Sequence, residues 1–236
     1  MKILFGAYRD WAIEAICRAT KLQDHEFLIE RTPEDFNTAA QHESWDAIII
    51  VGWSWKVPPA VVNSKLVVGM HPSNLPMFAG GSPIQNQILA GLTESKATLF
   101  KLNEKFDEGE IVDKEPISLI GHLDEVLDSI GSATSKLIDR FVSTFPNHVL
   151  TKQAGKGSHV RRLKPEHSKL PLPAELGPTI LEGDGIVFFE TETVKRIVTC
   201  KEMWDIIRCH EDPYPNAYFE DETGKLTIVR AEFESK

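Results

Sequence analysis

The segment from His71 to Ile84 holds the side chains best suited to chemistry. A histidine follows a short apolar run directly, and the segment contains three prolines and the adjacent glycines Gly80 and Gly81. Prolines fix φ and stiffen such a loop, while glycines permit close backbone approach. A histidine at the end of a buried strand is well placed for acid–base work. The residue types alone fit a stiff connection between a strand and a helix equally well.

A second segment with chemical potential is the acidic cluster from Asn103 to Val112. Most such runs are solvated turns between strands. Asp107 differs because Phe106 and Ile111 flank it with apolar side chains. A carboxylate brought near His71 would orient the imidazole ring and stabilise its charged form. We therefore pair His71 and Asp107 as candidate catalytic residues.

The elements that must position these residues alternate between apolar runs and helical periodicity. Strands are expected at 2–6, 25–29, 45–51 and 66–68, with a helix at 10–22 and another element beginning at 58–59. Later come a helix at 82–90, which Ser82 can cap, a strand at 97–102 and a long helix at 123–145. The alternation predicts a doubly wound, Rossmann-like α/β domain with a parallel sheet, whose binding sites lie at the carboxyl ends of its strands.

Three parts are expected along the chain. Residues 1–150 form the main domain, and 151–190 form an extended linker rich in glycine and proline. Residues 191–236 form a small unit with a helix from Thr193 to about Cys209 and a β-hairpin at 216–233. A unit of this size is too small to fold alone, so it should dock on the main domain or on a second copy of the chain.

Composition narrows the functional classes. The net charge of −9 disfavours a nucleic-acid partner, since the only basic cluster lies within residues 152–164. No apolar run approaches the roughly 20 residues of a membrane span, and no signal peptide is visible, so a cytoplasmic protein is expected. Cys17, Cys200 and Cys209 lack the spacing of a disulfide framework or a zinc site, and no metal is expected.

Together the two chemical segments resemble the 10-formyltetrahydrofolate-dependent formyltransferase family, which includes methionyl-tRNA formyltransferase and the sugar N-formyltransferases. The family loop His-Pro-Ser-x-Leu-Pro-x-Tyr-x-Gly-x-x-Pro is similar to residues 71–83, with Phe78 at the aromatic position. The family signature Asp-x-Gly-x-Ile matches Asp107, Gly109 and Ile111. The tail at 212–219 resembles that of the short sugar-modifying members, to which the chain is most similar.

The resemblance implies that an unprotonated amine attacks the formyl carbon of 10-formyltetrahydrofolate. His71 would handle the proton and help to stabilise the oxyanion, and Asp107 would orient His71. The chain departs from the family at Gly69, where members carry an oxyanion-binding asparagine. Either Asn74, Gln85, Asn86, a backbone amide or water replaces it, or transfer is slow or of another acyl unit, or the site is a degenerate binding module. The retention of His71 and Asp107 favours replacement.

The resemblance also implies two sets of binding residues. The folate site would be formed by the loop after the third strand and by the acidic segment, namely Trp53, Ser54, Trp55, Val57, Asn103, Glu104 and Phe106. The acceptor would contact residues near the first strand, in the histidine loop and in the tail, namely Arg9, Trp11, Ser73, Asn74, Phe78, Gly80, Gly81, Tyr214, Asn216 and Tyr218. Core packing of the tryptophans, solvent exposure of Arg9 and a dimer interface at the tyrosines are the alternative interpretations.

A nucleotide-linked amino sugar is the expected acceptor, and polysaccharide biosynthesis would suit such a product. Methionyl-tRNA is the second choice. The acidic net charge and Ala79, which stands where tRNA-acting members carry arginine, argue against it. A hydrolase that releases formate from the folate is the third, and a homodimer is compatible with each of them.

Overall fold

A six-stranded sheet forms the centre of the main domain in this computed structural model, which describes residues 1–42, 44–170, 188–191, 194–197 and 199–235. The strand order is β2-β1-β3-β4-β6-β7. The bounds are β1 (Lys2–Gly6), β2 (Glu26–Glu30), β3 (Ala47–Val51), β4 (Val67–His71), β6 (Glu94–Lys101) and β7 (Ile111–Ser118). The first four strands in sequence pair in parallel, as expected, whereas β6 and β7 join antiparallel.

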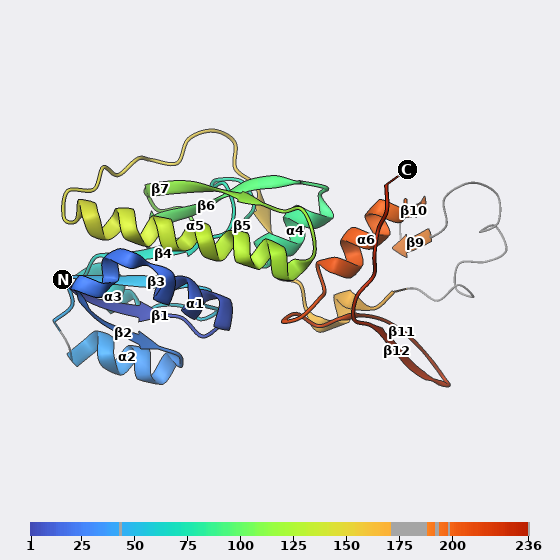
Figure 1. Ribbon diagram of the computed structural model, residues 1–236, viewed down its shortest axis with the longest axis horizontal. Helices are drawn as coiled ribbons and strands as arrows, with labels where there is room; N and C mark the ends of the chain where they lie inside the picture. The colour runs from blue at the N-terminus through green and yellow to red at the C-terminus, as the bar shows by residue number, and fades with distance from the viewer. Residues whose placement is uncertain (43, 171–187, 192–193, 198, 236) are drawn as a thin grey trace.

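Helices cover both faces of this sheet (Figure 1). Along β1, Ile3 and Phe5 enter the core beneath α1 (Asp10–Arg18) and α5 (Leu123–Thr144). Leu4 points to the opposite face, where α2 (Pro33–His42) and α3 (Pro59–Ser64) contribute to the second core. The alternation follows from the two-residue period of a strand, and each fully buried side chain of this size contributes about 1.5–3 kcal/mol.

Helix α2 has no counterpart among the sequence predictions, although its start is marked. The Thr32 hydroxyl accepts a hydrogen bond from the Asp35 amide, and the same hydroxyl donates to the Asp35 carboxylate. Pro33 occupies the first helical position. A Thr-Pro start with acidic residues in the first turn is a standard helix signal. The helix predicted over 10–22 ends instead at Arg18 and continues as the 3₁₀ turn η1 (Thr20–Asp24).

The histidine loop is held by a strand from the predicted linker. Its β5 (Ala79–Gly80) pairs in parallel with β8 (His159–Val160), and α4 (Pro83–Leu89) follows. Pro83 stands at the start of α4 as expected, but the predicted cap at Ser82 is wrong. Ser82 adopts a left-handed conformation (φ 51°), and its hydroxyl accepts a hydrogen bond from the Leu163 amide instead of capping α4. The linker prediction for 171–187 lies outside the described residues.

The C-terminal unit contains more strand than expected. The turn η2 (Pro165–Ser168) precedes a hairpin of β9 (Phe188–Thr191) and β10 (Val194–Ile197), helix α6 (Cys200–Arg208), and a hairpin of β11 (Ala217–Asp221) and β12 (Gly224–Ile228). The predicted helix from Thr193 is therefore wrong over 194–197. The β-branched Val194 and Ile197 favour a strand, and Thr199 caps α6 by accepting from the Glu202 amide.

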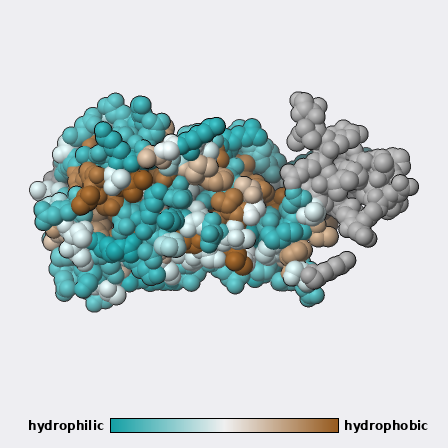
Figure 2. Space-filling model, turned by 90° about the horizontal axis from the view of Figure 1, so that it is seen from above, coloured by the Kyte–Doolittle hydropathy of each residue, from teal (hydrophilic) through white to brown (hydrophobic). Residues whose placement is uncertain are grey.

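Buried polar contacts dock this unit on the main domain. The Arg208 guanidinium, 2% exposed, donates to the Leu119 and Gly121 carbonyls at 2.8 Å and pairs with Asp205. The His122 imidazole lies 2.7 Å from the Glu211 carboxylate. The face shown in Figure 2 is mainly hydrophilic and carries scattered apolar patches. Among the described helices, none has the length and hydropathy to span a membrane.

Candidate active site

His71 is the last residue of β4 and is 7% exposed. Its Nδ1 lies 3.6 Å from Asp107 Oδ2, and its Nε2 lies 2.9 Å from the Phe78 carbonyl oxygen. Both ring nitrogens therefore face hydrogen-bond acceptors. The imidazolium form can donate to both at once, while a neutral ring can donate to only one. The structure thus brings the two predicted catalytic residues together.

The Asp107 carboxylate is fixed from the opposite side. Its Oδ2 accepts a hydrogen bond from the Gly80 amide at 2.7 Å, and Asp107 itself has a left-handed backbone (φ 55°). Gly80 has φ 102°, and a Cβ there would lie 2.4 Å from the Val160 carbonyl oxygen, so only glycine fits. A non-glycine residue in the left-handed region stores strain that the surrounding contacts must offset, and such strain clusters at functional sites.

Ser73, Asn74 and Phe78 shape the histidine loop and do not line the cavities described below. The fully buried Ser73 hydroxyl donates to the Met77 carbonyl at 2.7 Å. The Asn74 side chain accepts a hydrogen bond from Lys114 at 2.6 Å. Phe78 presents its carbonyl to His71, and its amide donates to the Ser158 hydroxyl at 2.8 Å. Their acceptor-binding role stays a prediction.

The larger of two cavities that meet at His71 measures about 710 Å³. It is lined by Gly69, Phe100 and Leu102 and by the 159–162 segment. It also brings together every residue predicted for the folate site: Trp53, Ser54, Trp55, Val57, Asn103, Glu104 and Phe106. The ring centroids of Trp53 and Trp55 lie 4.9 Å apart in an edge-to-face contact. Trp55 is 44% exposed, so it is not a core residue. Apolar walls with a polar rim suit a flat, partly polar ring.

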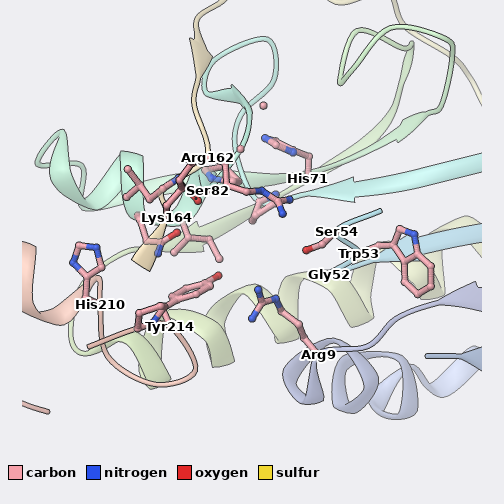
Figure 3. Close-up of a pocket in the computed structure, with 18 of the residues that line it drawn as sticks. Arg9, Gly52, Trp53, Ser54, His71, Ser82, Arg162, Lys164, His210 and Tyr214 are labelled. Atoms are coloured by element: carbon pink, nitrogen blue, oxygen red, sulfur yellow. Dashed lines mark hydrogen bonds between the residues drawn. The ribbon is translucent and has the colours of Figure 1, made fainter. Parts of the chain in front are cut away.

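The second cavity, about 310 Å³, also reaches His71, and residues that line it are drawn in Figure 3. The predicted Arg9, Trp11, Gly80, Gly81 and Tyr214 line it. Gln85, which the sequence analysis named as a possible replacement for the oxyanion-binding asparagine, lines it as well. So do Arg162, Lys164 and His210, which the sequence predictions did not place in the site. None of its described lining residues is Asp or Glu. The cavity is therefore cationic in a chain whose net charge is −9.

The cations of this second cavity are poorly neutralised. The Arg9 guanidinium lies 5.1 Å from the rings of both Tyr8 and Tyr214. Across the described ranges, neither Arg9 nor Arg162 pairs with a carboxylate. Lys164 pairs with Glu166 at 3.5 Å. Guanidinium groups without carboxylate partners are typical of sites that receive phosphate or carboxylate ligands.

Two polar atoms of residues that line this cavity are buried without a hydrogen-bond partner, and two neighbouring groups have shifted pKa values. Burial raises the pKa of the Tyr214 phenol, although Arg9 acts in the opposite direction. Burial lowers the pKa of His210, whose Nδ1 lies 2.8 Å from the Ile206 carbonyl. A neutral His210 that donates through Nδ1 leaves Nε2 as an acceptor, and this atom is buried without a partner, as is the Trp11 indole N–H. A ligand with polar groups would satisfy both.

Asn216 and Tyr218 lie apart from Tyr214. They line a third cavity of about 350 Å³, which shares only Pro165 and Pro215 with the cationic cavity. The Asn216 amide donates to the His210 carbonyl at 3.0 Å, and Lys225 lies 3.8 Å above the Tyr218 ring. Hairpin packing thus accounts for part of what these two residues do.

At Gly69, an asparagine like that of the family would require neighbouring side chains to move. A Cβ there would lie 2.6 Å from Leu102 Cδ1 and 3.2 Å from Phe100, so these side chains occupy the space. Asn86 is not free to replace it, because its side-chain amide donates to the Gly81, Ser82 and Arg161 carbonyls. Within the described ranges there is no group of three His, Cys, Asp or Glu side chains that could hold a metal ion.

Sequence signals existed for some of the residues that were missed. Arg162 and Lys164 belong to the basic cluster at 152–164, which by itself indicates no position in the fold. The pairing of β8 with β5 carries this cluster over the cavities. His210 follows α6, and no motif distinguishes it.

Comparison with known proteins places these observations in a family. The model of the family described as "Formyl transferase" matches residues 17–138, which is just over half of the chain. The methionyl-tRNA formyltransferase of Rickettsia prowazekii is 26% identical over 193 residues, covering 80% of this chain and 55% of that protein. The chain spans about half the length of the curated relatives it matches.

Solved structures agree with this fold. A methionyl-tRNA formyltransferase from Clostridium thermocellum superposes with a TM-score of 0.79 at 22% identity, covering 99% of this chain and 94% of that one. A sugar N-formyltransferase from Shewanella sp. FDAARGOS_354 gives 0.72 at 17% identity, covering 100% and 99%. At these identities the likeness shows a shared fold and leaves the acceptor open.

Proposed function

We propose that this chain, which belongs to the formyltransferase family, transfers a formyl group from 10-formyltetrahydrofolate to the amine of a nucleotide-linked amino sugar. The observation that carries the acceptor class is the cationic cavity beside His71, with Arg9, Arg162 and Lys164 and no carboxylate among its described lining residues. A nucleotide-linked sugar bears phosphates that such groups bind. Its amine would approach His71 while the phosphates remain near the arginines.

The larger cavity suits the folate. Trp53, Trp55 and Phe106 offer apolar and aromatic surface, and Asn103 and Glu104 lie among its polar lining residues. A volume of about 710 Å³ lies within the range of pockets that hold drug-sized ligands. The bound folate supplies the formyl group.

The chemistry of the chain's own residues then follows from their positions. The amine nitrogen forms a bond to the formyl carbon, the bond from that carbon to the donor nitrogen breaks, and one proton passes from the amine to the released donor. His71, between the two cavities, is placed to carry that proton. The Asp107 carboxylate, 3.6 Å from His71 Nδ1, would attract the ring in its charged form. The cleft walls exclude part of the competing water.

Methionyl-tRNA is the second candidate acceptor, and the sequence relatives favour it. Against it stand the small volume of the cationic cavity, about 310 Å³, and the overall charge of −9. A tRNA would have to contact a wide basic surface, whereas the only basic cluster in the sequence is confined to residues 152–164. A binding module without activity is the third alternative.

The test is a transfer assay on the purified protein with 10-formyltetrahydrofolate and parallel acceptors. Nucleotide-linked amino sugars, the same sugars without the nucleotide, and methionyl-tRNA are incubated separately, and formylated products are measured by mass spectrometry. We expect product from a nucleotide-linked amino sugar and little from the free sugar. Product from methionyl-tRNA alone would replace the first proposal by the second. No product from any amine would refute both.

Arg9→Ala tests the role of the cationic cavity, because Arg9 lines that cavity and not the larger one. Loss of a charge-assisted contact of about 1.5–3 kcal/mol raises KM for the nucleotide sugar roughly 10- to 100-fold. The folate dissociation constant should not change. The matched control is Arg31→Ala, which removes an exposed arginine that pairs with Asp10 outside the site. Equal effects of the two variants would show that only overall charge matters.

A further inference from the structure

Helix α4 carries two buried glutamines in contrasting environments. The Gln87 amide is fully buried, donates to the Pro72 and Pro83 carbonyls at 2.8 and 2.9 Å, and accepts from the Ser95 hydroxyl. Gln85 is only 4% exposed and lines the cationic cavity together with His71. In the described parts of the chain, no group forms a hydrogen bond with the Gln85 side chain. The Gln85 amide does not belong to the polar atoms that are buried without a partner, so it remains accessible from the cavity that it lines and is available to bind a ligand there.

The chemistry of the cavity restricts what that ligand group can be. Arg9, Arg162 and Lys164 repel a positive charge, so an amine in this cavity is favoured in its neutral form. A neutral amine needs an acceptor for its N–H groups. Ser54 Oγ lies 2.8 Å from the Tyr8 hydroxyl, and the Ser82 hydroxyl accepts from the Leu163 amide, so each has one hydrogen-bond position taken. The side chains of His210 and Tyr214 lie toward the far end of the cavity (Figure 3).

We propose that Gln85 binds the amino group of the acceptor, with Oε1 accepting one N–H and thereby directing the nitrogen lone pair toward the formyl carbon beside His71. This inference rests on the proposed function and adds a residue to it. A neutral amide suits this position better than a carboxylate does. A carboxylate would stabilise the ammonium form, in which the lone pair is bound to a proton and cannot attack.

Kinetics of Gln85→Ala and Gln85→Glu test the proposal. Gln85→Ala should lower kcat/KM for the acceptor at least threefold, and about tenfold for a hydrogen bond of ordinary strength. Its folate dissociation constant should match that of the wild type, because Gln85 does not line the larger cavity. Gln85→Glu keeps an acceptor atom but raises the pKa of the bound amine, so the acidic limb of the pH–rate profile should move to higher pH.

A stability measurement separates a ligand-binding amide from a structural one. Gln85→Leu removes no hydrogen bond within the described structure, so its melting temperature should equal or exceed that of the wild type. Gln87→Leu, the matched control, leaves buried carbonyls and a hydroxyl without partners and should melt at a lower temperature. Equal losses in both variants would assign Gln85 a structural role and overturn the proposal.

The kinetic outcomes also distinguish this inference from the function on which it rests. If the wild type formylates an amine and Gln85→Ala does so within threefold of its rate, the inference alone fails. If Gln85→Glu loses as much activity as Gln85→Ala without a shift in pH profile, Gln85 acts as a donor to oxygen and the amine-binding role is wrong. If the wild type transfers no formyl group to any amine, both fail.

Discussion

Replacing Asp107 by asparagine isolates the charge that faces His71. The asparagine retains an oxygen for the Gly80 amide, which donates to Asp107 Oδ2 at 2.7 Å. It also retains the size of the side chain, so the left-handed backbone at this position is not burdened further. What disappears is the negative charge 3.6 Å from His71 Nδ1.

The size of the effect follows from that distance. Two unit charges at 3.6 Å interact by roughly 4–5 kcal/mol at an effective dielectric constant of about 20. The Asp107 side chain is 17% exposed, so water reduces this value. We take roughly 2–4 kcal/mol as the loss of stabilisation for a charged His71. At about 1.4 kcal/mol for each factor of ten, kcat should fall about 30- to 1000-fold.

The assay measures kcat with both substrates saturating, together with folate affinity from quenching of Trp53 and Trp55 fluorescence. We expect a large loss in kcat, an unchanged folate affinity and a melting temperature close to that of the wild type. The matched control is Asp113→Asn, which removes a carboxylate that pairs with Arg140 away from both cavities. If Asp107→Asn retained kcat within threefold of the wild type, the electrostatic role of Asp107 would be refuted.

Two further predictions concern stability. Gly109→Ala should lower the free energy of unfolding in denaturant by about 3 kcal/mol or more, because its Cβ would lie 1.6 Å from the Lys101 carbonyl oxygen. Gly155→Ala, where space is open but φ is 89°, should lower it by only about 1–2 kcal/mol. Equal losses in the two variants would contradict the steric argument. Burial disfavours a charged His122, but Glu211 and Glu232 outweigh it and raise its pKa, so this contribution to stability is complete below about pH 6.5 and is lost as pH rises through the folded-state pKa. When the free energy of unfolding is measured as pH rises above about 6.5, His122→Asn should show a smaller loss of stability than the wild type. An equal loss in the variant would exclude His122 as its source.

Local patterns predicted much of the fold. The apolar run at 45–51 lies in the two-faced core of the sheet as β3, and the long stripe at 123–145 became α5. The turn residues around Asp221 to Gly224 join β11 to β12. In each case the burial pattern and the local conformational preference favour the same element, so the sequence of that segment alone is enough to predict it. The antiparallel addition of β6 and β7 could not be read in this way, because direction depends on pairing with distant strands.

Local patterns likewise identified some residues of the candidate site and missed others. His71 and Asp107 sit in two distinct segments whose residue types point to chemistry, and the structure brings them together. Arg162 and His210 reach the cationic cavity only through tertiary packing, so no local pattern identifies them. Ser82 was predicted to cap α4 because serine is a good capping residue, but its hydroxyl accepts a hydrogen bond from the Leu163 amide instead. The positions and hydrogen bonds of such residues depend on contacts with distant parts of the chain.

The short pairing of β8 with β5 limits where recombination could replace the C-terminal part of such a chain. Residues 159–162 form one wall of the larger cavity, although they lie beyond the main domain expected at 1–150. A recombination event at residue 150 would remove that wall together with Arg162. A crossover after Pro165 would leave both the wall and the arginine in place. A segment that can accept a new C-terminal part without losing the wall of its larger cavity therefore extends about 15 residues past the domain boundary expected at residue 150.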